Sequence, residues 1–231
     1  MTKLSQQEIL DILQVDDAVH PLPPEIQDEM AIPTYLHTNP LIRWLFWKRY
    51  ECITKIASFS KDMSVLEFGC GIGVYLPTLS SCAGTVYAIY LFPHHAMSLV
   101  KRMKLNVTFV ADLSQIPVNH LDLIIAADVI EHLDNPSEYI KKFKSKLKPG
   151  GRIIISGPTE NIFYKFGKMF AGFKKKGGYH HNNIYQITSL FRKHKMKVEN
   201  IINLPFGIPP YLFKVIEFKQ LNQVIAGFLR G

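Results

Sequence analysis

The sequence predicts an α/β fold in which helices cover both faces of a mainly parallel sheet. From residue 64 onward, short runs of branched and aromatic residues alternate with stretches of helical spacing. Strands that alternate with helices in this way usually form a parallel sheet that is buried on both faces. A glycine-rich turn follows the first of these strands, and this is a position where such sheets bind ligands.

Length and composition indicate one large domain without a membrane-spanning segment. The chain has 231 residues, of which 47% are hydrophobic and 20% charged, as in an average globular protein. It lacks the run of roughly 18 apolar residues that a spanning helix needs, and its first residues lack the pattern of a signal peptide. Because the 3 cysteines show no CxxC spacing, we expect a cytoplasmic protein without disulfides or a zinc site.

The charges are distributed unevenly along the chain. Residues 1–138 contain 9 basic and 16 acidic residues, whereas residues 139–231 contain 18 basic and only 3 acidic residues. The two parts therefore carry net charges of −7 and +15, which combine to the overall +8. A nucleic acid, an acidic lipid surface or an anionic substrate could each bind the basic part. A solvated lysine-rich face without a partner is the alternative.

The N-terminal region is expected to contain a helix, an irregular arm and a second helix. Ser5–Glu8 has the pattern of a capping box, so a short helix should begin near residue 5. His20–Pro33 contains four prolines and should be irregular. Asn39 and Pro40 are typical of an N-cap and of the first helical position, and a helix should follow over residues 41–59.

The remaining elements are predicted from periodicity and turn signals. Strands are expected over residues 64–68, 85–90, 107–110, 121–126, 152–156, 196–203 and 211–218. Helices are expected from about residue 74, over residues 93–102, after Asn135–Pro136 and over residues 183–194. Pro149–Gly151 should end the third helix, and residues 157–183, rich in Gly, Phe and Lys, should form an insertion over the ligand-binding edge of the sheet.

The glycine-rich turn reads VLEFGCGIG over residues 65–73. A dinucleotide-binding turn has the pattern G-x-G-x-x-G, which would require glycine at position 74, where this chain has Val74. Glu67 would repel a pyrophosphate but would suit a ligand with positive ammonium and sulfonium groups. A strand-to-helix turn without a ligand is the alternative interpretation.

Three segments resemble, in order, the motifs of class I S-adenosylmethionine (SAM)-dependent methyltransferases. These segments are VLEFGCGIG, FVADL and LDLIIAADVIEHLDNPSEYIKKFKSKLKPGGRIIIS. The most similar group, of the type 11 kind, includes the ubiquinone-biosynthesis O-methyltransferases, and the resemblance covers about residues 40–204. It implies a Rossmann-like sheet of seven strands whose last strand is antiparallel. It also implies SAM as cofactor and methyl transfer to a small or lipophilic acceptor at O, N or C.

The resemblance also suggests how the chain is organised. Residues 40–231 would form the methyltransferase domain, with a lid-like insertion at about residues 157–183. Residues 1–39 would form an N-terminal helix and arm that cover the cofactor site.

Cofactor contacts follow from the resemblance residue by residue. The methionine end of SAM would lie along Glu67, Gly69, Cys70, Gly71 and Gly73. Arg49, 20 residues before Gly69, matches an arginine that faces the SAM carboxylate in the related O-methyltransferases. A surface arginine on an amphipathic helix is an equally good interpretation of Arg49.

The resemblance places the adenosine end along the next strands. Asp112 would accept a hydrogen bond from the adenine amino group, and Leu113 would lie against the ring. Ala127 and Asp128 would lie where the fourth strand opens onto the cofactor. The family usually has an acid for the ribose hydroxyls at the end of the second strand, where this chain has Tyr90. Losing charge-assisted hydrogen bonds would weaken binding by roughly ten- to a hundredfold.

Three histidines are candidate catalytic bases. A base is needed only if the acceptor must lose a proton, and histidine is the usual base near neutral pH. His132 follows the fourth strand on the cofactor side, and His180 and His181 follow the insertion. Pocket shaping by His132 and an exposed pair in a loop are the alternatives. The adjacent pair has no nearby carboxylate and does not predict a metal site.

Two other functions remain open. Tyr90 favours a non-catalytic protein of this fold that binds a partner through its basic C-terminal half. The positive charge favours a nucleic-acid methyltransferase. Against this, DVIEH follows the fourth strand in place of the Asn/Asp-Pro-Pro-aromatic sequence of nucleic-acid amino-methyltransferases. No RNA-binding appendage is visible either.

Residues 161–176 suggest a further partner. Their sequence, NIFYKFGKMFAGFKKK, interleaves aromatic and apolar residues with lysines, a pattern suited to the surface of an anionic membrane. The hypothesis is a peripheral membrane association that brings the site to a lipophilic acceptor. Packing of the same residues onto the sheet or around an acceptor pocket is the alternative.

Overall fold

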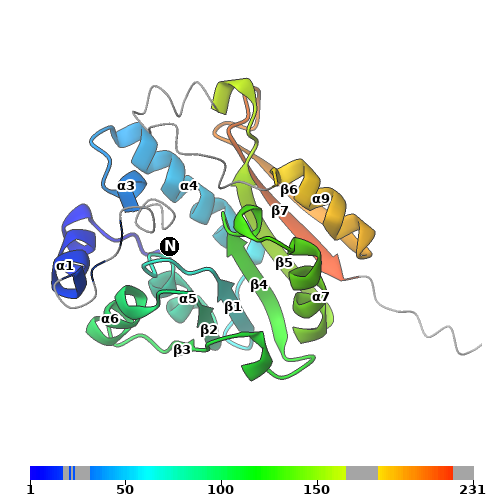
Figure 1. Cartoon of the computed structure of the whole chain (residues 1–231), viewed down its shortest axis with the longest axis horizontal. Coiled ribbons are helices and arrows are strands. Elements are labelled where there is room, and N and C mark those ends of the chain that lie inside the picture. Colours follow the sequence, from blue (N-terminus) through cyan, green and yellow to red (C-terminus); the bar gives the residue numbers. More distant parts are fainter. Residues whose placement is uncertain (18–20, 22, 24–31, 165–181, 221–231) are drawn as a thin grey trace, which may run out of the picture.

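A computed structural model describes residues 1–17, 21, 23, 32–164 and 182–220 (Figure 1). Its centre is a seven-stranded sheet in the order β3-β2-β1-β4-β5-β7-β6. The strands are β1 (Ser64–Phe68), β2 (Thr85–Ile89), β3 (Thr108–Phe109), β4 (Leu121–Ala127), β5 (Leu147–Pro158), β6 (Met196–Leu204) and β7 (Phe213–Gln220). The predicted α/β fold with a seven-stranded sheet is therefore confirmed.

The sheet is parallel except for its last strand along the chain. β1 is parallel to β2 and β4, β2 to β3, and β4 to β5. β7 lies between β5 and β6 and is antiparallel to both. The antiparallel direction of the last strand was predicted, and its place between β5 and β6 is what the structure adds.

Helices lie on both sides of the sheet, as Figure 1 shows. The α-helices are α1 (Gln6–Asp17), α3 (Ile32–Tyr35), α4 (Pro40–Ala57), α5 (Leu76–Cys82), α6 (His94–Arg102), α7 (Pro136–Lys146) and α9 (Ile184–Lys193). Two short 3₁₀ helices, η1 (Leu113–Gln115) and η2 (Ile130–His132), follow β3 and β4.

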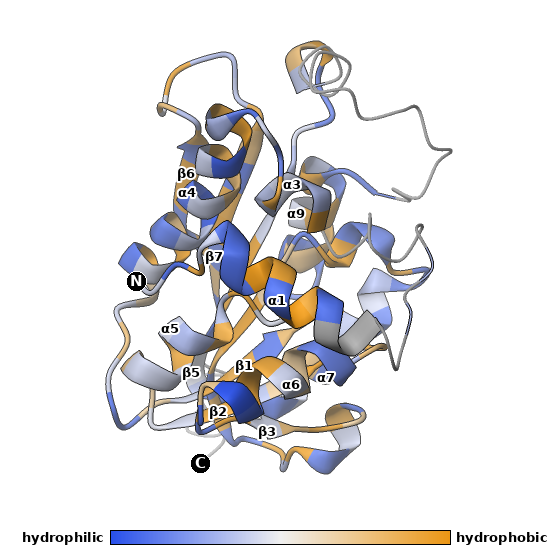
Figure 2. Ribbon diagram, turned by 90° about the vertical axis from the view of Figure 1, so that its left-hand side faces the viewer, coloured by the Kyte–Doolittle hydropathy of each residue, from blue (hydrophilic) through white to orange (hydrophobic). Residues whose placement is uncertain are grey.

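Alternating side chains of the strands form two cores. Val65 packs into the core that includes residues of α4, α5 and α6, whereas Leu66 packs into the core beneath α7 and α9. Hydrophobic residues follow the central strands in Figure 2, and α1 shows both hydrophobic and hydrophilic residues. The alternation in each strand is the period of two that a sheet covered on both faces requires.

The cap predicted at Asn39 is present, and the structure adds a second cap at Asn183. The Asn39 side chain accepts a hydrogen bond from the N–H of Leu41 at 2.9 Å, and Pro40 begins α4. Asn183 and Gln186 form a reciprocal capping box at the start of α9. Such caps satisfy backbone N–H groups that a helix leaves without partners, so neighbouring residues specify where both helices begin.

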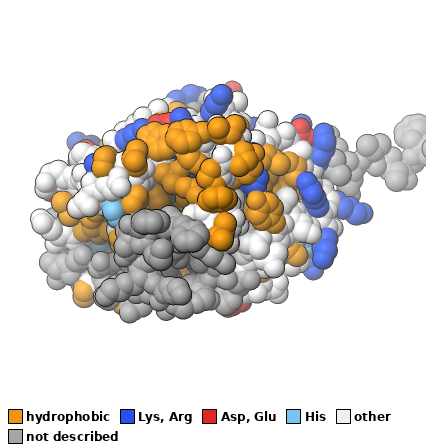
Figure 3. Space-filling view, turned by 90° about the horizontal axis from the view of Figure 1, so that it is seen from above, with side chains coloured by type: hydrophobic (Ala, Val, Ile, Leu, Met, Phe, Trp, Pro, Cys, Tyr) orange, Lys and Arg blue, Asp and Glu red, His pale blue; other side chains and the backbone are white. Residues whose placement is uncertain are grey.

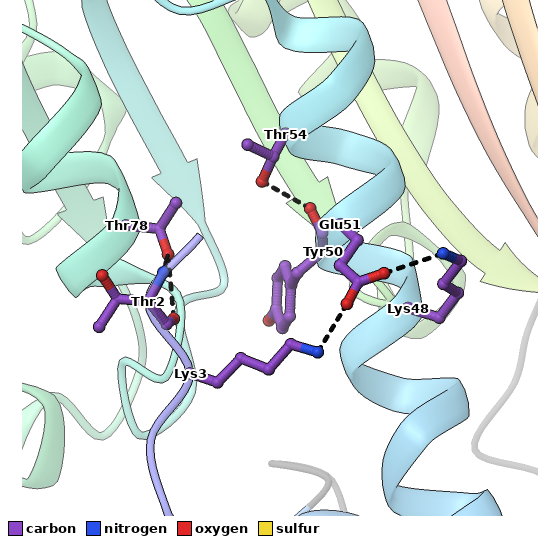
Figure 4. Close-up of polar contacts among 7 residues, drawn as sticks. All are labelled: Thr2, Lys3, Lys48, Tyr50, Glu51, Thr54 and Thr78. Atoms are coloured by element: carbon purple, nitrogen blue, oxygen red, sulfur yellow. Dashed lines mark hydrogen bonds and ion pairs between the residues drawn. The ribbon is translucent and has the colours of Figure 1, made fainter.

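The N-terminal segment is bound between α4 and α5 (Figure 4). Thr2 and Thr78 exchange two hydrogen bonds, each of 3.1 Å, between their backbone and hydroxyl groups. The ammonium of Lys3 lies 2.6 Å from the carboxylate of Glu51, which Lys48 approaches to 2.9 Å. These contacts attach the start of the chain to the domain core.

Three elements begin two or more residues away from their predicted starts. β5 begins at Leu147 and includes Pro149–Gly151, because Leu147 already pairs with Leu121 of β4 and Gly150 adopts a φ of 78°. α5 begins at Leu76, after the glycine turn has ended. β7 begins at Phe213, because the N–H of Leu212 still closes the turn onto the carbonyl of Leu204 at 2.8 Å.

Other predictions fall on parts of the chain without a description. Most of the arm at residues 20–33, most of the insertion at residues 157–183 and the C-terminal residues 221–231 lie outside the described residues. Within the described part, no helix is long and apolar enough to cross a membrane.

Candidate functional site

A cavity of about 880 Å³ lies at the carboxyl ends of the parallel strands. Its walls include the glycine turn after β1, residues 89–91 at the end of β2, residues 111–114 around η1 and residues 127–129 at the end of β4. Tyr35 of α3 and Arg49 and Tyr50 of α4 also line it. The edge where parallel strands end is the usual ligand site of doubly wound sheets, so the cavity is the candidate functional site.

The glycine turn requires backbone conformations that other residues avoid. Gly69, Gly71 and Gly73 have φ values of 82°, 54° and 82°, in the left-handed region that glycine adopts without steric cost. A Cβ on Gly69 would lie 2.3 Å from a methyl carbon of Val129. The turn can therefore pass beside the end of β4 only with glycine at position 69.

Glu67 is buried at the carboxyl end of β1. It is 2% exposed, and its Oε2 atom has no hydrogen-bond partner within the described part of the chain. Burial raises the pKa of Glu67 to about 8, because a carboxylate is poorly stabilised away from water. A cationic group of a ligand beside Glu67 would stabilise the charged form.

Tyrosines from three elements surround the region of Glu67. Tyr50 of α4 stacks on Tyr75 with ring centroids 4.4 Å apart, and burial raises the pKa of both phenols. The charge of Glu67 raises the pKa of Tyr35, Tyr50 and Tyr75 further. The sequence patterns did not single out these tyrosines, because each comes from a different element.

Arg49 extends from α4 to the end of β4. Its guanidinium forms an ion pair with Asp128 and lies 4.3 Å from the ring centroid of Phe46 and 5.2 Å from that of Phe213. Arg49 is 2% exposed, so the structure corrects the interpretation of a surface arginine. Asp128 also accepts a hydrogen bond of 2.7 Å from the Ser156 hydroxyl, which connects the ends of β4 and β5.

The opposite end of the cavity contains Tyr90, Asp112 and Leu113. Asp112 caps η1 by accepting a hydrogen bond of 2.5 Å from the N–H of Ser114, and this bond lowers the pKa of Asp112. Lys142 and Lys146 of α7 line the same end of the cavity. Their contribution was missed because their spacing on an amphipathic helix looks like that of an ordinary solvated face.

The predicted cofactor residues mostly surround this one cavity. Nine of them line it, namely Arg49, Gly69, Cys70, Gly71, Tyr90, Asp112, Leu113, Ala127 and Asp128. Glu67 lies beneath the lining, and a Cβ on Gly73 would face Leu76, Ala96 and Leu99 instead of the cavity. Gly73 therefore shapes the packing of the turn on α6. The roles assigned to these residues in cofactor binding remain predictions.

Of the three candidate bases, His132 lies in the described part of the chain. His132 of η2 lines the cavity, and its role as a base remains a prediction. His180 and His181 lie outside the described residues. Across the described residues, no group of three or more His, Cys, Asp or Glu side chains could hold a metal ion.

One buried acid next to His132 was missed. Glu131 in η2 is 1% exposed, and burial raises the pKa of its carboxyl to about 7. An acid shortly after the long apolar strand β4, beyond Asp128, was the available signal, but the neighbouring histidine is the more familiar base.

Comparison with known proteins gives the class of protein that this fold and cavity define. The family described as "Methyltransferase domain" matches residues 43–198, which is more than half of the chain. The chain therefore belongs to the methyltransferase domain family.

Two curated relatives show how far the similarity extends. The chain is 28% identical over 99 residues to the ubiquinone biosynthesis O-methyltransferase of Xanthomonas axonopodis pv. citri (strain 306), covering 40% of this chain and 41% of that protein. It is 23% identical over 164 residues to the protein of the same name from Hydrogenovibrio crunogenus (strain DSM 25203 / XCL-2), covering 66% of this chain and 65% of that protein. The matches thus span less than two thirds of the relatives' own length.

A solved structure shares the fold. The N-methyltransferase NodS from Bradyrhizobium japonicum WM9, in complex with S-adenosyl-L-homocysteine (SAH), has a TM-score of 0.62 and 16% identity, covering 85% of this chain and 96% of that chain. At this identity the likeness supports the fold.

Proposed function

We propose that this protein transfers the methyl group of SAM to a small or lipophilic acceptor. The observation that carries the proposal is the cavity at the carboxyl ends of β1–β4, which nine of the predicted cofactor residues line. Membership of the methyltransferase domain family supports it, as do the names of the curated relatives, which are O-methyltransferases.

The residues present fit SAM. Glu67 has a buried carboxyl oxygen without a partner in the described part of the chain, and a cationic ligand would supply the missing positive charge. Gly69 and Gly71 adopt positive φ and have no side chains in the turn that borders the cavity, so a ligand can approach the backbone closely.

The residues of the chain would bind, orient and shield the reactants. Gly69–Gly71 and Glu67 would hold the methionine end, Asp112 and Leu113 the adenine, and Tyr90 one ribose hydroxyl. Bound SAM supplies an activated methyl group on its sulfonium. Catalysis then requires that the chain align the acceptor with that group and exclude water. The N-terminal residues 1–39 would help to cover the site, in line with Tyr35 being part of the cavity wall.

An exposed apolar patch, part of it on α4 ahead of Arg49, supports a lipophilic acceptor. Its members are exposed hydrophobic residues from the start of α4, the segment after β5 and the β6–β7 turn, namely Leu41, Trp44, Ile162, Phe163, Phe206 and Ile208. Trp44 stacks on Phe206 with centroids 5.7 Å apart. Figure 3 shows hydrophobic side chains gathered on this end of the molecule. Contiguous exposed apolar surface usually serves binding.

The membrane-surface role of residues 161–176 is a finer part of the proposal. Ile162 and Phe163 are exposed, and residues 165–176 lie outside the described residues. A cytoplasmic protein that associates peripherally with anionic lipid would sediment with anionic liposomes at low salt. Sedimentation that is unchanged when Lys174, Lys175 and Lys176 are replaced by Glu would overturn the lipid role.

Calorimetric titration with SAM and SAH tests the proposed function most directly. We expect both to bind with dissociation constants between the micromolar and millimolar ranges, the weaker end reflecting Tyr90. The absence of binding by either compound would overturn the proposal. Binding without methyl transfer to any acceptor would instead favour a non-catalytic protein of this fold.

A further inference from the structure

A pair of acids lies at the carboxyl ends of β4 and β5, beyond the wall of the cavity. Glu131 belongs to η2 after β4, and Glu160 follows β5. Both carboxyl oxygens of Glu131 and the Oε1 atom of Glu160 are buried without a hydrogen-bond partner within the described ranges. Buried polar atoms are nearly always hydrogen-bonded, so these oxygens are free to accept hydrogen bonds from a ligand.

Arg49 connects this pair of acids to the cavity. Arg49 lines the cavity, and its positive charge lowers the pKa of Glu131, whereas the charge of Glu160 raises it. Tyr164 lies near the same groups, because the charges of Glu160, Glu131 and Arg49 all affect its pKa. The Tyr164 ring packs on Phe213 at 5.5 Å between centroids, and Phe213 also contacts the Arg49 guanidinium. The acids therefore belong to the same end of the sheet as the cavity.

Gly157 near the end of β5 places the backbone close to Glu131. A Cβ at position 157 would approach Ile184 Cδ1 to 3.1 Å and Glu131 Oε1 to 3.8 Å. Glycine at this position therefore permits the close packing of Ile184 of α9 beside the Glu131 carboxyl group.

We infer that Glu131 and Glu160 form the acceptor subsite, in which Glu131 binds the hydroxyl or amine of the acceptor and takes its proton. This inference rests on the proposed function. When an acceptor X–H is methylated, the X–C bond forms as the methyl–sulfur bond breaks, and the bonding electrons stay on sulfur. The proton of X–H passes to the Glu131 carboxylate and leaves to solvent after the product.

The groups around Glu131 suit this role. The charges of Arg49 and Glu160 act on Glu131, and Arg49 is already paired with Asp128. Burial raises the pKa of the Tyr164 phenol, which lies close enough for the charges of Glu160 and Glu131 to raise that pKa further. The net surroundings are thus acidic, which favours binding of a hydrogen-bond donor. The pKa of Glu131, about 7, lies near neutral pH, where a general base is most effective.

Binding of acceptor probes to protein saturated with SAH tests the inference. Catechol represents a hydroxyl acceptor and benzylamine an amine acceptor, and each is titrated at pH 6 and pH 8. At least one probe should bind the wild type, more tightly at pH 8, and Glu131→Gln should weaken it at least tenfold at pH 8. Glu199→Gln, which changes an acid on the distant strand β6, serves as the matched control and should bind like the wild type.

The outcomes separate the inference from the proposed function. Saturation with SAH is measured first, so its absence counts against the proposed function alone. Binding of neither probe, or equal binding by wild type and Glu131→Gln, would overturn the acceptor subsite. With SAM and a probe that binds, the rate should rise with pH near 7 in the wild type but lack this rise in Glu131→Gln. A thermal midpoint at pH 6 at least as high as that of the wild type shows that the variant is folded.

Discussion

Glu67 and Glu131 are two buried acids in the same sheet edge, and their surroundings differ. Glu67 ends β1 below the glycine turn, among tyrosines from α3, α4 and the segment before α5. Glu131 follows β4, with a second acid and an arginine nearby. Burial raises the pKa of both, but only the second lies beside another carboxyl group. Under the proposed function, Glu67 would face a fixed cationic ligand and Glu131 would exchange a proton with the acceptor.

Gly71→Val should have the largest effect on cofactor binding, because Gly71 belongs to the glycine turn near Glu67 and lines the cavity. Its branched side chain would be placed at a φ of 54° on the cavity wall, so SAH affinity should fall more than a hundredfold by calorimetry while circular dichroism shows a retained fold. Gly207→Val is the matched control, since Gly207 has a φ of 78° and no atom within 4 Å of an added Cβ. Unchanged SAH affinity in Gly71→Val would show that the turn is not the cofactor site.

Arg49→Met should affect both the cavity and the surroundings of Glu131, because Arg49 lines the cavity and its charge acts on Glu131. Removing one partner of a buried ion pair costs about 3–5 kcal/mol, and we expect the lower value because Asp128 is 20% exposed. Urea unfolding measures the loss of free energy of unfolding. In the double variant Arg49→Met/Asp128→Asn, much of it should be recovered, since no unpaired acid remains. Equal destabilisation with and without Asp128→Asn would contradict the importance of the pair.

Glu67→Gln should remove a pH dependence of stability. Because the folded-state pKa is raised to about 8 from an ordinary 4.5, the folded chain holds the proton more tightly, and stability falls as pH rises through this window. The variant should match the wild type at pH 4.5 and melt several degrees higher at pH 8.5, measured by thermal denaturation.

Glu131→Gln sharpens the comparison with Glu67→Gln. It should show the same sign of stabilisation over the window from about 4.5 to about 7. Only Glu67→Gln should also weaken SAH binding, by about tenfold for one lost charge-assisted contact. Equal effects of both variants on SAH affinity would contradict the different roles proposed for Glu67 and Glu131.

Tyr90→Asp should have the smallest effect, and it is the one gain of binding. A carboxylate accepts two hydrogen bonds from ribose hydroxyls where a phenol makes one, so SAM affinity should rise by about tenfold or less. Tyr90→Phe is the control and should weaken binding slightly. If Tyr90→Asp abolishes binding, the tyrosine itself makes a favourable contact and the assignment of the second strand needs revision.

Local sequence determined much of the fold. The glycine turn, the cap at Asn39 and the strand periods are each specified within a few residues, and the structure has them where they were expected. The start of β5 was wrong, because Pro149–Gly151 signals a break locally whereas the pairing of Leu147 with Leu121 continues the strand. Pairing with a distant strand overrides a local turn signal.

The tertiary structure alone decided the electrostatics of the site. The sequence shows Glu67 as an acid within one apolar strand and Glu131 as an acid that follows another, but it does not show that their oxygens lack partners. The Arg49–Asp128 pair joins a helix to a strand end far along the chain, and the sequence alone could not show that Arg49 is buried there. The reason is physical: backbone conformation depends on neighbours in sequence, whereas the charge state of a buried group depends on everything that the fold brings within a few ångströms of it.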